Sequence, residues 1–219
     1  MSKKIGVLLS GCGVYDGSEI HEAVLTLLAL DKAGAQAVCM APDMDHLHVI
    51  NHFSQETTDE KRNVLVESAR IARGQIQNLK DVKSSDIDAL ILPGGFGAAK
   101  NLSTFAVHGP DAELNPEVER IINEMVSAKK PVGAICIAPA TLTRAISAKK
   151  PEVTIGNDLS TAQAIEKMGG VHINCSVDMI HVDKNNNLVT TPAYMLGPGI
   201  KDIAVGIEKL VNKVMSMIE

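Results

Sequence analysis

The sequence predicts an α/β protein built on a mostly parallel sheet with helices on both faces. Short, continuously apolar runs alternate along the chain with longer segments of helical periodicity. Strands that alternate with helices in this way form parallel sheets covered on both sides. No linker, repeat or low-complexity tract interrupts the 219 residues, so a single domain over residues 1–219 is expected.

Five short apolar runs are expected to form strands: residues 5–9, 35–40, 89–92, 132–136 and 153–156. The periodic segments between and after them are expected to be helices: residues 19–32, 58–73, 116–129, 139–148, 158–168 and 200–219. Ser18 and Thr58 are capping residue types for the first two helices, and Gly34 and Gly74 are typical of their ends. The polar residues 43–55 predict an irregular segment.

A hairpin is expected near the end of the chain. Residues 171–183 and 188–191 flank Lys-Asn-Asn-Asn at 184–187, which is a strong turn signal. An antiparallel hairpin of this kind belongs at the periphery of a parallel sheet.

The composition excludes several classes of protein. A net charge of −5 and the absence of any long Lys/Arg cluster argue against a nucleic-acid partner. The first apolar run covers only residues 5–9, too short for a signal-peptide core or a membrane span, so no membrane partner and a cytoplasmic protein are expected. The four cysteines lack zinc-site spacing, and we expect free thiols and no metal.

Three loops are expected to meet at one edge of the sheet: residues 10–19, 92–98 and 136–139. Each follows a predicted strand, and the sites of parallel sheets lie beyond the carboxyl ends of their strands. This rim is therefore the predicted functional site.

Cys136 is the candidate nucleophile at this rim. The apolar strand ends at this residue and passes straight into a helix, which is typical of the sharp turn that raises a nucleophile above a sheet. The N–H groups and dipole of the next helix are expected to favour the thiolate. From these residues alone, a buried structural thiol is an equally good interpretation.

The glycines at 94 and 95 let the chain turn directly after a strand. The N–H groups of Gly95 and Ile137 are candidates for an oxyanion hole over the thiol, although an ordinary tight turn has the same pattern. Gly11, Gly13 and Gly17 miss the spacing of a dinucleotide fingerprint by one residue, and no cofactor is expected.

Glu19 and Glu22 share one face at the start of the first helix. Glu19 is expected mainly to complement the helix dipole, whereas Glu22, one turn further in, is placed to reach the thiol or a substrate hydroxyl. No histidine adjoins Cys136. The histidines at 46, 48 and 52 fit no standard metal site and are expected in a solvated loop.

These residues resemble the class I glutamine amidotransferase-like superfamily of PfpI type. The resemblance rests on Pro-Gly-Gly at 93–95, Ala-Ile-Cys-Ile-Ala-Pro at 134–139 and the helix-borne Glu22. Longer strings at 5–22, 93–102 and 189–195 are similar to its ElbB group, the bacterial enhancing-lycopene-biosynthesis proteins. The resemblance implies a flavodoxin-like three-layer sandwich, a homodimer and no metal or cofactor.

The resemblance also implies a glutathione-independent glyoxalase linked to isoprenoid biosynthesis. In that chemistry Cys136 attacks glyoxal, a small dicarbonyl, and the hemithioacetal is converted to glycolate. Gly95 and Ile137 would supply oxyanion N–H groups, and Glu22 would hold the thiolate and move the proton. Release of early glyoxal adducts from other molecules, or deglycation, is another origin for such an activity.

The sequence departs from the superfamily in its histidines. Ile137 stands where many members carry His, and the paired His-x-Glu of amidotransferases is absent. His172 is the nearest match to the distal histidine of some members. A weak base predicts slow turnover and leaves two alternatives open. One is a glutamine amidotransferase-like subunit, and the other is a non-catalytic redox-sensing or partner-binding protein in which Cys136 is oxidised.

Overall fold

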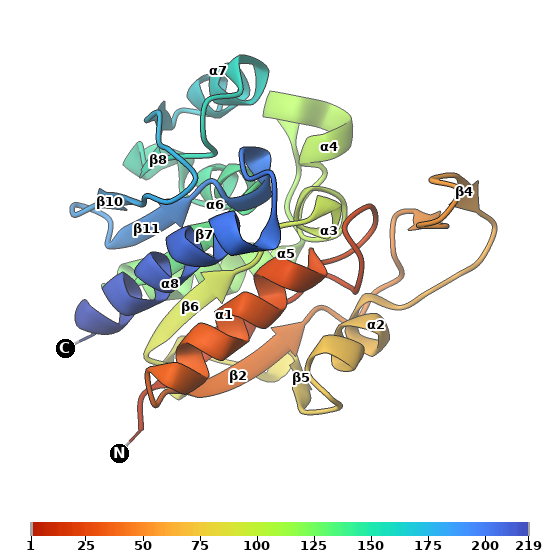
Figure 1. Ribbon diagram of the computed structural model, residues 1–219, viewed down its shortest axis with the longest axis horizontal. Helices are drawn as coiled ribbons and strands as arrows, with labels where there is room; N and C mark the ends of the chain where they lie inside the picture. Colours follow the sequence, from red (N-terminus) through yellow and green to blue (C-terminus); the bar gives the residue numbers. More distant parts are fainter. Residues whose placement is uncertain (1, 219) are drawn as a thin grey trace.

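A seven-stranded sheet forms the middle layer of the computed structural model, in which residues 2–218 are described (Figure 1). Its strands are β1 (Lys4–Leu8), β2 (Gln36–Ala41), β5 (Ile76–Asn78), β6 (Ala89–Leu92), β7 (Val132–Ile135), β10 (His181–Asp183) and β11 (Leu188–Thr191). Their order across the sheet is β10-β11-β7-β6-β1-β2-β5. Within this seven-stranded sheet of residues 2–218, only β10 and β11 pair in antiparallel fashion, so the predicted mostly parallel sheet with a peripheral hairpin is confirmed.

Eight α-helices lie in residues 2–218: α1 (Ile20–Lys32), α2 (Val64–Ile71), α3 (Phe96–Lys100), α4 (Phe105–His108), α5 (Pro116–Ser127), α6 (Ala138–Ala145), α7 (Leu159–Lys167) and α8 (Ile200–Ser216). Helices α1, α2 and α8 pack on one face of the sheet, and α3, α5 and α6 pack on the other (Figure 1). This is the flavodoxin-like three-layer arrangement that was expected.

Alternation along the central strands builds the two cores. Ile5, Val7 and Ile91 point to the face covered by α1 and α8, whereas Leu90 and Leu92 point to the face covered by α5. All five are fully buried. Each such side chain stabilises the fold by about 1.5–3 kcal/mol. Strands buried on both faces therefore read as the continuous apolar runs from which they were predicted.

Several predicted boundaries are wrong where the chain leaves the sheet. The second helix starts at Val64 rather than at Thr58, because the Asn63 side chain accepts the Val66 N–H and caps it. Thr58 instead belongs to the ribbon of β3 (Val49–Ile50) and β4 (Thr57–Thr58), which projects from the body as an arm (Figure 1).

Further differences concern short elements. The edge strand β5 is polar and three residues long, and α3 and α4 span five and four residues, so none carries a periodic signal. The expected long strand over 171–183 is reduced to β9 (Val171–His172), paired with β8 (Glu152–Val153), and to β10. The last helix ends at Ser216, and the prediction for residue 219 lies outside the described residues.

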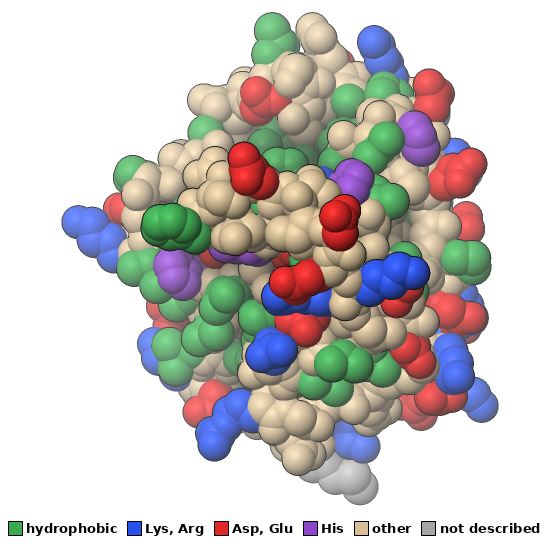
Figure 2. Space-filling model, turned by 90° about the vertical axis from the view of Figure 1, so that its right-hand side faces the viewer, with side chains coloured by type: hydrophobic (Ala, Val, Ile, Leu, Met, Phe, Trp, Pro, Cys, Tyr) green, Lys and Arg blue, Asp and Glu red, His purple; other side chains and the backbone are tan. Residues whose placement is uncertain are grey.

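On the face that carries the arm, acidic, basic and hydrophobic side chains are interspersed (Figure 2). Basic side chains form no continuous area on the part of the surface seen in this view.

Candidate active site

Three loops meet at the carboxyl ends of β1, β6 and β7, which lie side by side in the sheet. Backbone hydrogen bonds join the first loop to the second: the Glu19 N–H donates to Gly94 O at 2.9 Å, and the Phe96 N–H donates to Val14 O at 2.7 Å. The third loop begins at Cys136, whose side chain accepts a hydrogen bond from the Gly95 N–H of the second loop. The rim that the sequence indicated is therefore one continuous structure.

Cys136 occupies a strained turn between β7 and α6. Its φ of 61° lies in the left-handed region, which a non-glycine residue adopts at a cost of about 1–3 kcal/mol. The side chain is 7% exposed and lines a cavity. Strain of this kind, together with an abrupt strand-to-helix turn, is the geometry of a nucleophile elbow.

Glu22 is fully buried beside Cys136. Its Oε2 accepts the Gly94 N–H at 3.0 Å, and its Oε1 accepts the Tyr194 N–H at 3.2 Å. Gly94 lies between the two side chains: a Cβ at this position would lie 2.5 Å from the Cβ of Cys136 and 2.6 Å from Oε2 of Glu22. Only glycine at position 94 allows the backbone N–H to donate to Glu22 while the Cys136 side chain packs against the same backbone.

Burial dominates the electrostatics of this pair. It raises the pKa of Glu22 to about 8, and the charge of Glu19 adds to the effect, while hydrogen bonds from Tyr194, Cys136 and Gly94 oppose it. Burial, and next the charge of Glu22, raise the pKa of the Cys136 thiol well above its usual range. The N–H groups of Gly95 and Ile137 favour the thiolate, as expected, but burial outweighs them.

Two backbone N–H groups are directed at the sulfur. Those of Gly95 and Ile137 both hydrogen-bond the Cys136 side chain and lower its pKa. The φ of Gly95 is 93°, a conformation that glycine adopts without strain and that turns the backbone toward the thiol. Charge that develops on or next to the sulfur would meet these two donors.

Glu19, rather than Ser18, caps α1. Its Oε2 accepts the Glu22 N–H at 2.7 Å, as the dipole interpretation of Glu19 suggests, and its buried side chain also lines the cavity. Ser18 does not cap the helix, because its hydroxyl accepts the Ser10 N–H at 2.9 Å. Glu19 therefore fixes the first turn of α1, from which Glu22 reaches the thiol.

The structure does not bring His172 to the cavity. It lies on β9, where its Nε2 accepts the Ile155 N–H at 3.3 Å, and burial lowers its pKa. Among the described residues that line the cavity, none is a histidine. The expected solvated histidine loop is wrong for His46, which is half-buried with Nδ1 2.8 Å from Asp16 O, whereas His52 is exposed and its Nε2 accepts the Tyr15 N–H at 3.2 Å.

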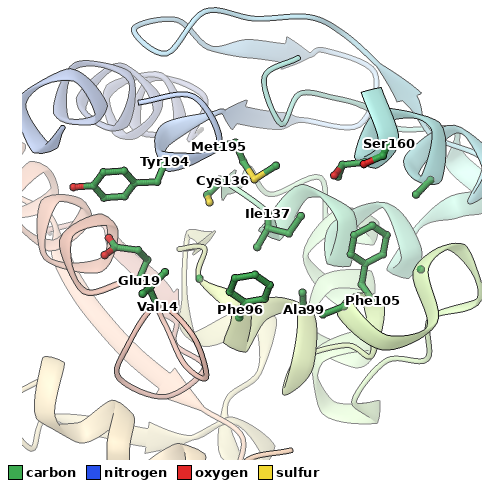
Figure 3. Close-up of a pocket in the computed structure, with 15 residues that line it drawn as sticks. Val14, Glu19, Phe96, Ala99, Phe105, Cys136, Ile137, Ser160, Tyr194 and Met195 are labelled. Atoms are coloured by element: carbon green, nitrogen blue, oxygen red, sulfur yellow. The ribbon is translucent and has the colours of Figure 1, made fainter. Parts of the chain in front are cut away.

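The cavity beside Cys136 has a volume of about 490 Å³ (Figure 3). Its lining comes from segments far apart in the chain: Val14, Glu19, Gly95, Phe96, Ala99, Phe105, Ala106, Gly109, Cys136, Ile137, Ser160, Thr161, Ala164, Tyr194 and Met195. Most of these side chains are apolar. Within residues 2–218, no group of three His, Cys, Asp or Glu side chains is placed to hold a metal ion.

Tyr194 is a site residue that the sequence did not reveal. Its N–H holds Glu22, and its hydroxyl lies 2.7 Å from Nδ1 of His21. The sequence string at 189–195 contributed to the family resemblance, but it did not indicate that Tyr194 belongs to the site. The sequence did not indicate that α4 and α7 line the cavity, because neither helix follows a strand that ends at the rim.

Curated relatives match nearly the whole chain. The ES1 protein homolog, mitochondrial, of Rattus norvegicus is 47% identical over 98% of this chain and 84% of that protein. The human glutamine amidotransferase-like class 1 domain-containing protein 3, mitochondrial, is 46% identical over 98% of this chain and 83% of that protein. Both names place those proteins in mitochondria, which contradicts the expected cytoplasmic location. None of the helices in residues 2–218 is both long and apolar enough to span a membrane.

Solved structures share the fold. A crystal structure of an isoprenoid biosynthesis protein with an amidotransferase-like domain from Ehrlichia chaffeensis has a TM-score of 0.94 and 37% identity, with both chains fully covered. Glyoxalase III from Candida albicans has a TM-score of 0.63 and 15% identity, with 99% of this chain and 98% of that chain covered, a similarity of fold alone. The DJ-1/PfpI family matches residues 12–194. The chain therefore belongs to the DJ-1/PfpI family.

Proposed function

We propose that this protein is a glutathione-independent glyoxalase that converts glyoxal to glycolate through Cys136, with no metal or cofactor. One observation carries the proposal: a cavity-lining cysteine in a strained elbow contacts a fully buried carboxyl whose pKa is about 8. A group that titrates near neutral pH is suited to both take and give a proton.

The first step would form a covalent bond between the sulfur and glyoxal. Ionised Glu22 takes the thiol proton, and the sulfur attacks one aldehyde carbon. The electron pair of the C=O bond moves to oxygen, and the N–H groups of Gly95 and Ile137, which hydrogen-bond the sulfur, would stabilise the charge there. Protonation by Glu22 then gives a neutral hemithioacetal.

The second step would be an internal redox change that needs no outside oxidant. Glu22, ionised again after the first step, removes the proton from the carbon bound to sulfur and then gives a proton to the neighbouring carbon. The first carbon is thereby oxidised to a thioester, and the second is reduced to an alcohol. Water then cleaves the thioester, releasing glycolate and the thiol.

Hydrolysis is expected to be the slow step. Glu22 is fully buried, is held by the Gly94 and Tyr194 N–H groups and is not part of the cavity lining. No histidine is among the described lining residues, so a water molecule at the thioester meets only the Glu19 carboxyl as a side-chain base. The same feature disfavours the glutamine amidotransferase alternative, whose chemistry also needs a base for hydrolysis.

The link to isoprenoid metabolism rests on similarity. The Ehrlichia chaffeensis protein, similar over the full length of both chains, is named for isoprenoid biosynthesis. This supports the proposal that the present chain belongs to the same ElbB-like group. The homodimer implied by the family resemblance stays a prediction.

Glyoxal turnover tests the proposal. We expect Cys136→Ser and Glu22→Gln each to lower kcat/KM by about 10²-fold or more, the scale of a lost nucleophile or proton-transfer group. Glycolate is measured without glutathione after treatment with a chelator. Cys175→Ser, which removes a half-buried thiol outside the cavity, is the matched control and should retain wild-type activity.

The proposed glyoxalase activity would be refuted if the wild-type protein were inactive or if Cys136→Ser retained wild-type activity. A redox-sensing role would then be the alternative to examine, by measuring oxidation of Cys136 under mild peroxide.

A further inference from the structure

The cavity is much larger than glyoxal, the smallest dicarbonyl. Its volume is about 490 Å³, whereas an apolar cavity of about 150 Å³ already accepts benzene. A substrate that carried only two carbonyl groups would leave most of this space to water. The volume therefore points to a substituent on the reactive carbonyl.

The lining is divided by polarity. Cys136, Glu19 and the backbone of Gly95 form one polar end. One wall, formed by Phe96, Ala99 and Phe105, is apolar, and Figure 3 shows Phe105 on the far side of Ile137 from Cys136, with Ser160 across the cavity from it. A molecule with its electrophilic carbon at the sulfur would place its other end against this apolar part.

The apolar walls remain partly open to solvent. Phe96 is 46% exposed, and Ala106 on α4 is also exposed although it lines the cavity. Covering such surface with an apolar group releases water and favours binding. A polar group of equal size would gain little, since side-chain hydroxyls enter the lining only at Ser160, Thr161 and Tyr194.

We propose that the preferred substrate is an aldehyde or α-dicarbonyl with an aromatic or branched alkyl substituent, which packs between Phe96 and Phe105 while the carbonyl meets Cys136. This inference rests on the proposed function for its chemistry, but the pocket preference is measurable without turnover.

Alkylation of Cys136 tests the preference directly. Iodoacetamide, its N-benzyl derivative and its N-(2,3-dihydroxypropyl) derivative are compared by peptide mass spectrometry, each rate being divided by that of glutathione with the same reagent. We expect the benzyl reagent to be favoured at least about tenfold over iodoacetamide, the gain from burying about two CH₂ groups. The dihydroxypropyl reagent should show no gain.

Two variants locate the effect. Ala164→Trp adds bulk to the cavity wall from α7, where Ala164 is only half-buried, and should abolish the benzyl preference while the iodoacetamide rate stays within about threefold. Val66→Trp adds the same side chain at a 62% exposed position on α2, outside the cavity lining, and should leave the preference intact.

The inference is overturned if the benzyl reagent has no advantage, if the dihydroxypropyl reagent matches it, or if Cys136 resists all three. Turnover in the same preparations separates the two proposals. If glyoxal is converted to glycolate but the benzyl reagent is not preferred, the proposed glyoxalase activity is supported and the proposed preference for an apolar substituent is refuted. If the benzyl reagent is preferred but neither glyoxal nor phenylglyoxal is turned over, the apolar pocket preference is supported and the proposed glyoxalase activity is refuted.

Discussion

Glu22 and Cys136 are buried ionisable groups that destabilise the folded chain when they are charged. Burial raises the pKa of both, and the N–H groups of Gly94 and Tyr194 offset only part of the effect on Glu22. Functional sites commonly hold such pairs, because reactivity requires groups that stability alone would remove. Replacing Glu22 with Gln removes the group whose ionisation costs stability, so the variant should gain stability relative to wild type as the pH rises, while its activity falls.

The pH dependence of that gain follows from the pKa of Glu22. Its rise from 4.5 to about 8 means that the folded chain keeps a proton which the unfolded chain has released. The contribution of Glu22 to the free energy of unfolding is fully present below about pH 4.5 and is lost as the pH rises through about 8. We expect the urea midpoint of Glu22→Gln, relative to wild type, to increase between about pH 6 and about pH 9.

Glu166→Gln, the same substitution at an exposed position on α7, is the control for this measurement. A Glu22→Gln advantage that shrinks as the pH rises would contradict the raised pKa.

Single residues were predictable from the sequence when a local turn defined them. Cys136 was identified because an apolar strand runs directly into a helix, and Glu22 because it lies one turn into a helix that starts at the rim. The charge state of Cys136 was not predictable, because it depends on burial by segments distant in sequence. His172 was proposed by position alone, and the ribbon of β8 and β9 holds it away from the cavity.

At the scale of elements, the long and regular segments were predictable, and the short ones were not. Strands β1, β6 and β7 are buried on both faces and therefore appear as continuous apolar runs. Helix α2 was misplaced because Thr58 and Asn63 are both good caps, and only the pairing of β3 with β4 decides between them. The segment from β6 to α3 is the element on which the site depends most closely.

Gly94→Ala tests that dependence. The added Cβ would lie 2.5 Å from the Cβ of Cys136, 2.6 Å from Oε2 of Glu22 and 2.9 Å from the Ile135 carbonyl. We expect a loss of about 1–3 kcal/mol in the free energy of unfolding and a loss of glyoxal turnover, because backbone must shift to make room. Denaturant unfolding and glycolate formation measure the two effects.

Gly199→Ala is the matched control, since its φ of −161° is extended and its Cβ would meet only Asp202 Oδ2, at 3.3 Å. Turnover by Gly94→Ala equal to that of this control would show that the backbone at Gly94 does not set the geometry of the pair.

At the scale of the whole molecule, the parallel sheet explains why one rim carries the chemistry. The order of β7, β6 and β1 places three strand ends side by side. The shared edge followed from alternation along the sequence, whereas the strand order did not. The apolar wall of the cavity did not follow, because Phe105 and Ala164 come from helices whose positions depend on packing across the domain. The same packing leaves no described histidine in the lining.

That arrangement predicts that a covalent intermediate accumulates on Cys136. The measurement that tests it most directly is a single-turnover reaction of excess protein with ¹³C-labelled glyoxal, quenched in acid at successive times and mapped by peptide mass spectrometry. A thioester survives acid, whereas a hemithioacetal reverts. The account predicts a labelled glycolyl group on the Cys136 peptide that rises and then decays into glycolate, and none in Cys136→Ser. Glycolate formed at the full rate while the Cys136 peptide stays unlabelled at every time would contradict it.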